Sequence, residues 1–250
     1  MSSDAPPSHT PHALLFDLGA VLLKIDMSAA FTQWSRFSPY AVEEIGALFK
    51  ALPLLEDHER GIVEDATFFE TLRTELQLHA SLGQIAEGWN AIFAGEFEAT
   101  RRLVQAVRDT VPCYALTNST ASHLATWPAL FPELASAFER VFASYALGAR
   151  KPDAEVFARV CAAMGCAPAE VLFFDDSPVN VEAAAAMGLR GVLVRSTADV
   201  ETALRDAGLL DQLARESDLG GRWHCIVVLR PSVIRIPPPQ HAKCFEGDPR

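Results

Sequence analysis

The sequence predicts an α/β protein, a doubly wound parallel sheet of the Rossmann type with a helical domain inserted into it. The first observation is a set of short apolar runs that are nearly continuous rather than alternating, as is typical of parallel strands covered on both faces. These runs occupy residues 13–16, 111–116, 171–174 and 191–194. The second observation is that helical patterns separate the last three runs, which favours a doubly wound sheet.

Two helices between these runs have recognisable ends. Residues 152–164 form the first, which begins at a proline and stops at Gly165. Residues 177–187 form the second, with Ser177 as a suitable N-cap and Pro178 at the first helical position. Each helix would carry the chain back across the sheet to the next parallel strand.

The third observation is a long connection after the first strand. About 90 residues separate the first two apolar runs, far more than one crossover helix needs. The connection is strongly helical, and its tryptophans, Trp34 and Trp89, are expected to pack in a core of its own. The predicted helices of this inserted module cover residues 27–37, 41–52, 64–76 and 82–93.

These observations divide the chain into parts. The core of the fold is expected from residues 12–26 and 101–214, and the helical insertion from residues 27–100. Residues 1–11 are rich in Ser, Pro and His and lack the features of a signal peptide, so we expect a disordered start. Residues 215–250 form a C-terminal extension to which the sequence assigns no role.

Composition limits the partners. The chain has 250 residues and a formal net charge of −11, so nucleic acid and anionic membranes are poor partners. No apolar run reaches the roughly 18 residues that span a membrane. The five cysteines are odd in number and form no CxxC pair, which indicates a reducing, cytoplasmic environment rather than a disulfide framework. A small molecule is the expected partner, for a monomer or a homodimer.

Polar residues follow three of the apolar runs. Asp17 follows the first run, Thr117 and Asn118 follow the second, and Asp175 and Asp176 follow the third. Ligands of open parallel sheets bind beyond the carboxyl ends of the strands, so these groups should converge on one crevice. Carboxylates gathered there repel one another unless a cation lies between them, and oxygen ligands favour Mg²⁺.

A phosphate site in so acidic a protein also needs local positive charge. Lys151 is the candidate lysine, and the hydroxyl of Thr117 with the backbone N–H groups after it would complete a phosphate cradle.

Four segments, in this order and spacing, resemble motifs I to IV of the haloacid dehalogenase superfamily: Phe16-Asp17-Leu18-Gly19-Ala20-Val21, Leu116-Thr117-Asn118, Arg150-Lys151-Pro152-Asp153 and Phe174-Asp175-Asp176-Ser177. The inserted helices resemble the C1-type cap of that superfamily. Within it, the chain is most similar to bacterial α-D-glucose-1-phosphate phosphatases of the YihX type. This finer similarity is carried by residues 58–61, 88–93, 127–128 and 147–152. The resemblance covers roughly residues 12 to 195.

The resemblance implies a role for each motif. Asp17 would attack phosphorus and form an aspartyl-phosphate. Mg²⁺ would be held by Asp17, the backbone carbonyl of Gly19 and Asp176, while Asp175 would ligate the ion or orient its waters. The resemblance therefore predicts a Mg²⁺-dependent phosphomonoester hydrolase acting on a small phosphorylated metabolite, such as a sugar-1-phosphate.

The remaining implied roles concern substrate binding. Thr117 and the Asn118 N–H would bind the phosphoryl oxygens, and Lys151 would neutralise developing charge and keep the nucleophile ionised. Glu59 and Arg60, in a charged segment between two predicted helices, would contact substrate from the inserted module.

The chain departs from the family pattern at Gly19. Most phosphatases of the superfamily carry an aspartate there, which protonates the leaving oxygen and later activates water. A glycine can do neither, so good leaving groups such as the hemiacetal oxygen of a sugar-1-phosphate should be favoured. Substitutes for the missing acid, none preferred, are Glu59, Arg60, His123, Asp26 or a metal-bound water.

Two other functions stay open at this point. A 2-haloacid dehalogenase would use Asp17 to attack carbon without a metal, but those enzymes carry an aromatic residue at position 19 and lack the paired acids. A phosphate-binding relative that lost turnover with its general acid is the other alternative. The persistence of all four motifs argues against that loss.

Overall fold

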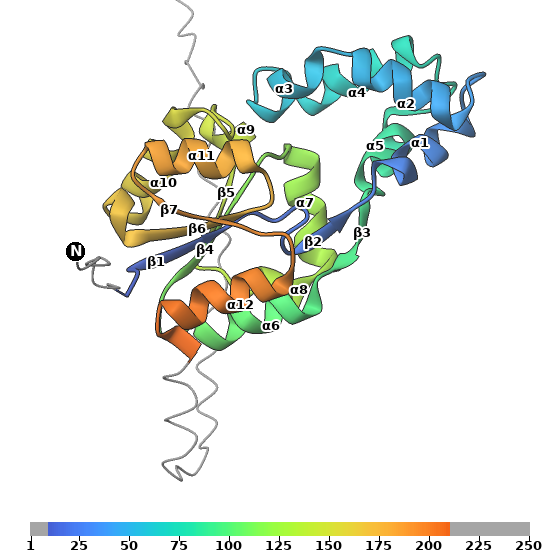
Figure 1. Cartoon of the computed structure of the whole chain (residues 1–250). Helices are drawn as coiled ribbons and strands as arrows, with labels where there is room; N and C mark the ends of the chain where they lie inside the picture. Colours follow the sequence, from blue (N-terminus) through green and yellow to red (C-terminus); the bar gives the residue numbers. More distant parts are fainter. Residues whose placement is uncertain (1–9, 211–250) are drawn as a thin grey trace, which may run out of the picture.

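The computed structural model describes residues 10–210 and has a five-stranded parallel sheet at its centre (Figure 1). The strand order is β5-β4-β1-β6-β7, in which the chain winds outward from β1 in both directions. The strands are β1 (Ala13–Phe16), β4 (Cys113–Thr117), β5 (Arg140–Ala143), β6 (Val171–Asp175) and β7 (Arg190–Leu193). The predicted doubly wound sheet is confirmed.

Alternate side chains of β1 pack into two separate apolar clusters, one on each face of the sheet. Leu14 and Phe16 lie in one buried cluster, and Ala13 and Leu15 lie in the other. Because successive side chains of a strand point to opposite faces, a continuous apolar run is needed when both faces are covered. The continuity of residues 13–16 is therefore explained by the position of β1 at the middle of the sheet.

Helices cover both faces of the sheet. The first cluster packs against α6 (Glu98–Val107), α7 (Ala121–Leu130), α8 (Pro132–Ala135) and α12 (Thr197–Asp206). The second packs against α9 (Ser144–Leu147), α10 (Ala154–Met164) and α11 (Pro178–Ala186), with the short helix η1 (Pro168–Glu170) before β6.

A separate bundle of helices lies to one side of the sheet, with a third apolar cluster of its own (Figure 1). Trp34 and Trp89 are buried at its centre and stack with ring centroids 6.4 Å apart. The bundle consists of α1 (Met27–Ser35), α2 (Val42–Ala51), α3 (Leu54–Glu59), α4 (Asp65–Glu75) and α5 (Leu82–Asn90).

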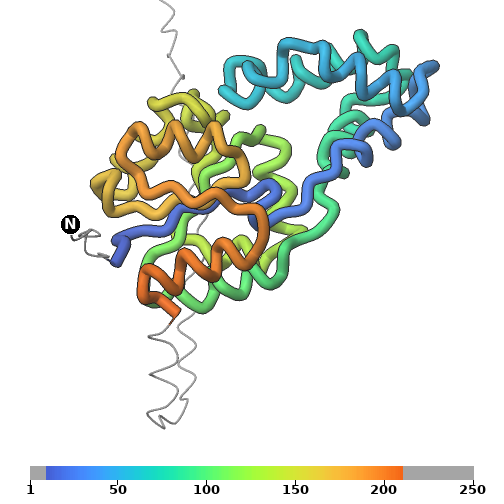
Figure 2. The backbone as a smooth tube through the Cα atoms, in the orientation of Figure 1, coloured from blue at the N-terminus to red at the C-terminus, as the bar shows by residue number. Residues whose placement is uncertain are grey.

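Two antiparallel strands join the bundle to the rest of the chain. The chain leaves the sheet through β2 (Leu23–Ile25) and returns through β3 (Phe93–Glu96), which pairs with it (Figure 2). Hydrogen bonds also link α5 to α7. The Asn90 amide donates to Ser122 Oγ at 2.8 Å, and Trp89 Nε1 donates to Thr120 Oγ1 at 3.3 Å.

Several elements differ from the sequence prediction. The short strands β2, β3 and β5 and the helix α3 were not predicted, because runs of three to six residues carry little periodicity. The ten-residue helices α6, α7 and α12 were not predicted either. His58 and Glu59, expected in the segment between two predicted helices, form the end of α3. Pro152 is not in the first turn of its helix. A turn precedes α10, which begins at Ala154 after Asp153.

Other predictions fall partly outside the described residues. The C-terminal extension at residues 215–250 lies outside the described residues, and so does the N-terminal segment 1–11 except for its last two residues. Two of the five cysteines, Cys225 and Cys244, also lie outside them. The three described cysteines, Cys113, Cys161 and Cys166, are free thiols. Among the described residues, no helix combines the length and the apolar character that crossing a membrane requires.

Candidate active site

Asp17 lies at the carboxyl end of β1, at the centre of the sheet edge where the polar groups were predicted to meet. Its backbone N–H donates to the carbonyl of Phe174 at 2.8 Å, which continues the pairing with β6. Its side chain is buried, and Oδ1 accepts from the Leu18 N–H at 2.7 Å. The carboxylate is thus fixed at the end of a central strand, facing the loops.

Lys151 is the cation of the site. Its Nζ lies 2.8 Å from Asp17 Oδ1 and 2.6 Å from Asp175 Oδ2, and the residue is 2% exposed. Burial opposes a charge on the lysine, but the two carboxylates outweigh it and raise the pKa of Lys151 above its ordinary value. Lys151 is therefore a permanent positive charge between two acidic side chains.

The side chain of Asn118 holds this lysine in position. Asn118 Nδ2 donates to the carbonyl oxygen of Lys151 at 2.9 Å, and Asn118 Oδ1 accepts from the Lys151 N–H at 2.9 Å. The segment after β4 is thereby tied to the loop before α10, far away in sequence. Thr117, at the end of β4, is buried beside this contact.

Three carboxylates gather beside the lysine. Asp17, Asp175 and Asp176 offer oxygen atoms within 4.8 Å of one another. Burial raises the pKa of Asp17 to about 6, with Lys151 opposing the rise and the charge of Asp175 adding to it. Burial and the charge of Asp175 also raise the pKa of Asp176. One lysine facing three carboxylates leaves two negative charges uncompensated, which a bound divalent cation would balance.

The candidate metal ligands are not equivalent. Asp175 already has three donors: Oδ2 faces Lys151, while Oδ1 accepts from Ser177 N–H and Asn180 Nδ2, each at 2.9 Å. Asp176 is the exposed member of the three. The carbonyl of Gly19 accepts from the Val21 N–H at 2.7 Å and keeps a second lone pair. An all-oxygen donor set of this kind fits Mg²⁺.

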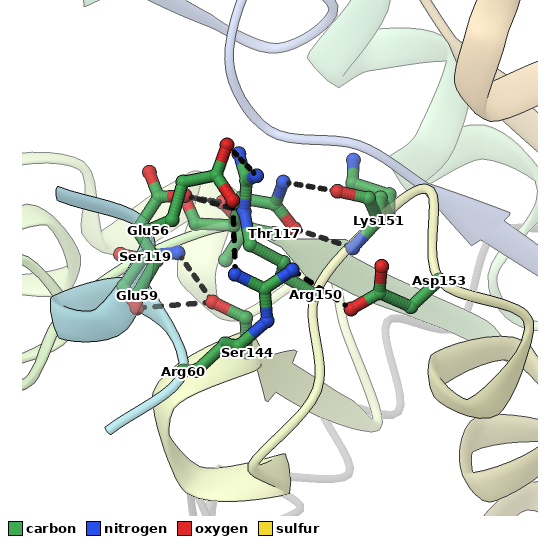
Figure 3. A network of polar contacts seen from close by, with 10 residues as sticks. Glu56, Glu59, Arg60, Thr117, Ser119, Ser144, Arg150, Lys151 and Asp153 are labelled. Carbon is green, nitrogen blue, oxygen red and sulfur yellow. Dashed lines mark hydrogen bonds and ion pairs between the residues drawn. The ribbon is translucent and has the colours of Figure 1, made fainter. Parts of the chain in front are cut away.

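Charged residues of α3 meet the loop that carries Lys151 (Figure 3). Arg150 lies 2.8 Å from Glu59 and 3.2 Å from Glu56, both on α3. Arg60, which follows α3, reaches Asp153 at 3.2 Å and Glu56 at 3.0 Å. The two arginines thus join the helical bundle to the loop, and Arg60, a predicted substrate contact, has acidic protein partners.

A cavity of about 170 Å³ lies between the bundle and the ends of the strands. Residues from the sheet side include Leu18, Gly19, Thr117, Asn118 and Ser119, and Glu59 lines it from α3. Burial raises the pKa of Glu59 against the opposing charge of Arg150. The other lining residues are Leu23, Ile25, Met27, Leu55, Trp89, Ile92, Phe93, His123 and Trp127.

Two of the proposed substitutes for the missing acid have structural tasks. Asp26 is the N-cap of α1, and its Oδ1 accepts from Ser28 N–H and Oγ at 2.9 and 2.6 Å. His123 donates from Nε2 to the carbonyl of Trp89 at 3.1 Å and stacks on that indole. Burial lowers the pKa of His123 to about 4, so it is neutral near pH 7.

Sequence reasoning missed how the site is supported. It took Asn118 as a backbone donor and overlooked its side chain, which binds Lys151. It gave no role to Ser144, whose Oγ accepts from the Ser119 N–H at 2.9 Å and donates to the Ser119 carbonyl at 3.2 Å. These partners are separated by 25 or more residues, so spacing alone carried no signal for them.

Known proteins resemble this chain over the region that holds the site. A family model described as haloacid dehalogenase-like hydrolase matches residues 12–188. The sesquiterpene phosphatase astK of Aspergillus oryzae is 28% identical over 186 residues, which cover 72% of this chain and 88% of that protein. Flavin mononucleotide hydrolase 1 of Arabidopsis thaliana is 34% identical over 68 residues, or 27% of this chain and 28% of that protein.

Solved structures agree with the fold. A haloacid dehalogenase family enzyme from Bacteroides thetaiotaomicron, in complex with magnesium and inorganic phosphate, is 25% identical with a TM-score of 0.66, covering 74% of this chain and 94% of that one. The L-2-haloacid dehalogenase of Xanthobacter autotrophicus is 22% identical with a TM-score of 0.56, covering 74% and 77%. The second likeness shows a shared fold alone.

Proposed function

The chain belongs to the haloacid dehalogenase-like hydrolase family, and from this we propose that it is a Mg²⁺-dependent phosphomonoester hydrolase with Asp17 as nucleophile. One observation carries the proposal. The Asp17 carboxylate lies at the carboxyl end of the central strand, 2.8 Å from a buried lysine and within 4.8 Å of two further carboxylates. Two relatives, astK and the Arabidopsis hydrolase, are named for the hydrolysis of phosphate esters or mononucleotides.

The residues support a two-step displacement. Asp17 attacks phosphorus, the bond from phosphorus to the ester oxygen breaks, and the released alcohol takes up a proton. Water then attacks phosphorus, which returns the carboxylate of Asp17 and releases inorganic phosphate. Lys151 would hold Asp17 ionised and offset the charge that develops on the phosphoryl oxygens, to which Thr117 and the Asn118 N–H would donate.

A divalent ion would complete this site. Asp17, Asp176 and the Gly19 carbonyl would hold it directly, and Asp175, whose oxygens already have donors, would act chiefly by holding Lys151. When bound, Mg²⁺ supplies positive charge that draws the phosphoryl oxygens toward the nucleophile. The Bacteroides relative, crystallised with magnesium and phosphate, supports this assignment.

The helical bundle is proposed to act as the C1-type cap. Its two connections run through β2 and β3, its α3 meets the Lys151 loop through Arg150 and Arg60, and its residues line the cavity beside Asp17. We place its limits at residues 27–100, inside a core formed by residues 12–26 and 101–214.

The leaving group has two candidate types. The family resemblance of the sequence favours a sugar-1-phosphate, whose hemiacetal oxygen departs without a strong acid. The relative astK is named for a sesquiterpene. These esters differ in polarity, so the lining of the cavity is the observation that separates them.

Hydrolysis of p-nitrophenyl phosphate tests the function. We expect release of phosphate with Mg²⁺, loss of release with EDTA, and recovery when Mg²⁺ is restored. The Asp176→Asn variant should need far more Mg²⁺ than the wild type for half-maximal rate. Release of chloride from 2-chloroacetate that survives EDTA would instead establish a dehalogenase. A protein that binds phosphate and turns over neither compound would be a non-catalytic relative.

A further inference from the structure

We infer that the substrate is the phosphate ester of an apolar alcohol, with an alkyl, prenyl or aryl group, rather than a sugar phosphate. The inference rests on the proposed function and concerns the organic part of the same substrate. It follows from the side chains that line the cavity beside Asp17 and from the partners that its polar groups already have.

The lining of the cavity is mostly apolar. Nine of its fifteen residues carry an aliphatic, thioether or indole side chain or a phenyl ring, and they come from the strands, the loops and the bundle alike. Three of the five polar lining residues, Thr117, Asn118 and Ser119, are consecutive at the end of β4, where the phosphate would lie. The part of the cavity away from the phosphate is therefore mostly apolar, with Glu59 and His123 as its polar side chains.

The two remaining polar residues have protein partners. His123 is neutral near pH 7 and donates to the carbonyl of Trp89. Glu59 lies 2.8 Å from Arg150. Among the described residues that line the cavity, Trp127 Nε1 and Glu59 Oε2 are buried without a hydrogen-bond partner, which leaves one donor and one acceptor. A hexose carries several hydroxyl groups, and this set cannot satisfy them.

Gly19 extends the apolar surface toward the reacting phosphate. A Cβ built at Gly19 would lie 3.6 Å from Ile25 Cγ1, so the glycine and the isoleucine border the same space. The glycine thus adds no charged side chain to the region beside the leaving oxygen.

Desolvation separates the two substrate classes. Each sugar hydroxyl that loses water without gaining a partner weakens binding, whereas each methylene that leaves water strengthens it. A volume of about 170 Å³ is on the order of that of six water molecules. A branched five-carbon group or a phenyl ring is of this size.

Kinetics on matched esters test the inference. We would compare kcat/KM for dimethylallyl phosphate and n-hexyl phosphate with that for α-D-glucose-1-phosphate, with p-nitrophenyl phosphate as reference. The expected result is at least a tenfold preference for the two apolar esters. Equal or greater activity on glucose-1-phosphate would overturn the inference while leaving the phosphatase function intact. Loss of all four activities would overturn the function, and the inference with it.

Binding of inert analogues gives a second readout that needs no turnover. In the presence of Mg²⁺, n-alkylphosphonates should inhibit competitively, with affinity rising about three- to fourfold for each methylene up to the length that the cavity holds. Affinity that is independent of chain length would contradict the inference even if hydrolysis is measured.

A matched pair of variants locates the effect in the cavity. Ile25 lines the cavity and is 41% exposed, whereas Ile62 is 68% exposed on the loop after α3 and lies outside the lining. Ile25→Asn should raise KM for n-hexyl phosphate at least fivefold and leave KM for p-nitrophenyl phosphate less affected. Ile62→Asn should change neither. Equal effects of the two substitutions on n-hexyl phosphate would argue against this cavity as the binding site.

Discussion

Asn118 and Lys151 are joined by two reciprocal hydrogen bonds, each 2.9 Å long, between the side-chain amide of the first and the backbone of the second. The contact ties the carboxyl end of β4 to the loop before α10. It fixes the backbone of Lys151, whose side chain reaches both Asp17 and Asp175. The asparagine of the Thr-Asn motif therefore has a task distinct from its backbone N–H.

Removing that amide should reduce turnover. Asn118→Ala keeps the backbone N–H but frees Lys151, and a misplacement of about 1 Å is enough to lower kcat by about 10²-fold. The free energy of unfolding should fall by about 1–3 kcal/mol, because buried backbone groups lose their partners. Asn90→Ala, which removes an amide contact with Ser122 outside the site, is the control and should leave kcat within about twofold. Similar kcat losses in both would contradict this role.

Gly19→Asp should fold and gain activity on poor leaving groups. Within the part of the chain that the structure describes, the only side chain within 4 Å of a new Cβ is Ile25 at 3.6 Å, an ordinary contact, and Gly19 is not among the glycines with a positive φ. A carboxyl group there can donate a proton to the leaving oxygen, and general acid help is worth about 10²–10⁴-fold. The measurement is kcat for alkyl phosphates against p-nitrophenyl phosphate. A fall for every ester would mean that the glycine is required sterically.

Loss of Arg150 should weaken substrate binding. Arg150 pairs with Glu56 and Glu59 of α3, and partly exposed pairs contribute about 0.2–1 kcal/mol each. If these contacts hold the bundle over the site, Arg150→Met should raise KM about two- to tenfold, and added salt should raise the wild-type KM in the same direction.

Arg159 provides the control for Arg150. It pairs with Glu155 within α10, away from the bundle, so Arg159→Met should leave KM unchanged. A KM for Arg150→Met equal to that of the wild type would show that the ion pairs do not govern substrate access.

His123 should make the protein less stable in acid. Its pKa is lowered to about 4 by burial, against about 6.5 in an unfolded chain. Between these values the unfolded state binds more protons, so the free energy of unfolding falls as the pH decreases from 6.5 to 4. The loss is about 2 kcal/mol at pH 5 relative to pH 7.5. Urea unfolding of His123→Gln, whose amide can still donate to Trp89, should lack this component, and an equal pH dependence in both proteins would contradict it.

The sequence predicted the parts of the fold that depend on local pattern. The run at residues 13–16 coincides with β1, and Pro178 is the first residue of α11, because buried strands and helix starts have strong local signals. The short β5 and α3 lack such signals. The convergence of Asp17, Asp175 and Asp176 could be predicted because parallel strands end at one edge of the sheet.

What could not be predicted depends on contacts between distant segments. Asn118 follows β4, Lys151 and Arg150 lie in the loop before α10, and their partners meet them only after folding. The contact of Arg150 with α3 depends in the same way on the folded position of that helix. The apolar character of the cavity also emerges only when Ile25, Trp89 and Phe93 are brought to the strand ends. The expectation of a sugar-1-phosphate substrate rested on sequence resemblance, which carries no information about this lining.

Covalent capture of phosphate on Asp17 tests the central proposal most directly. The protein would be mixed with Mg²⁺ and p-nitrophenyl phosphate, quenched in acid within one turnover, digested and analysed by mass spectrometry. We predict phosphate on Asp17 in the wild type, and neither phosphate nor turnover in a folded Asp17→Asn variant. Phosphate attached to another residue, or near-normal turnover by Asp17→Asn, would contradict the assignment of Asp17 as nucleophile.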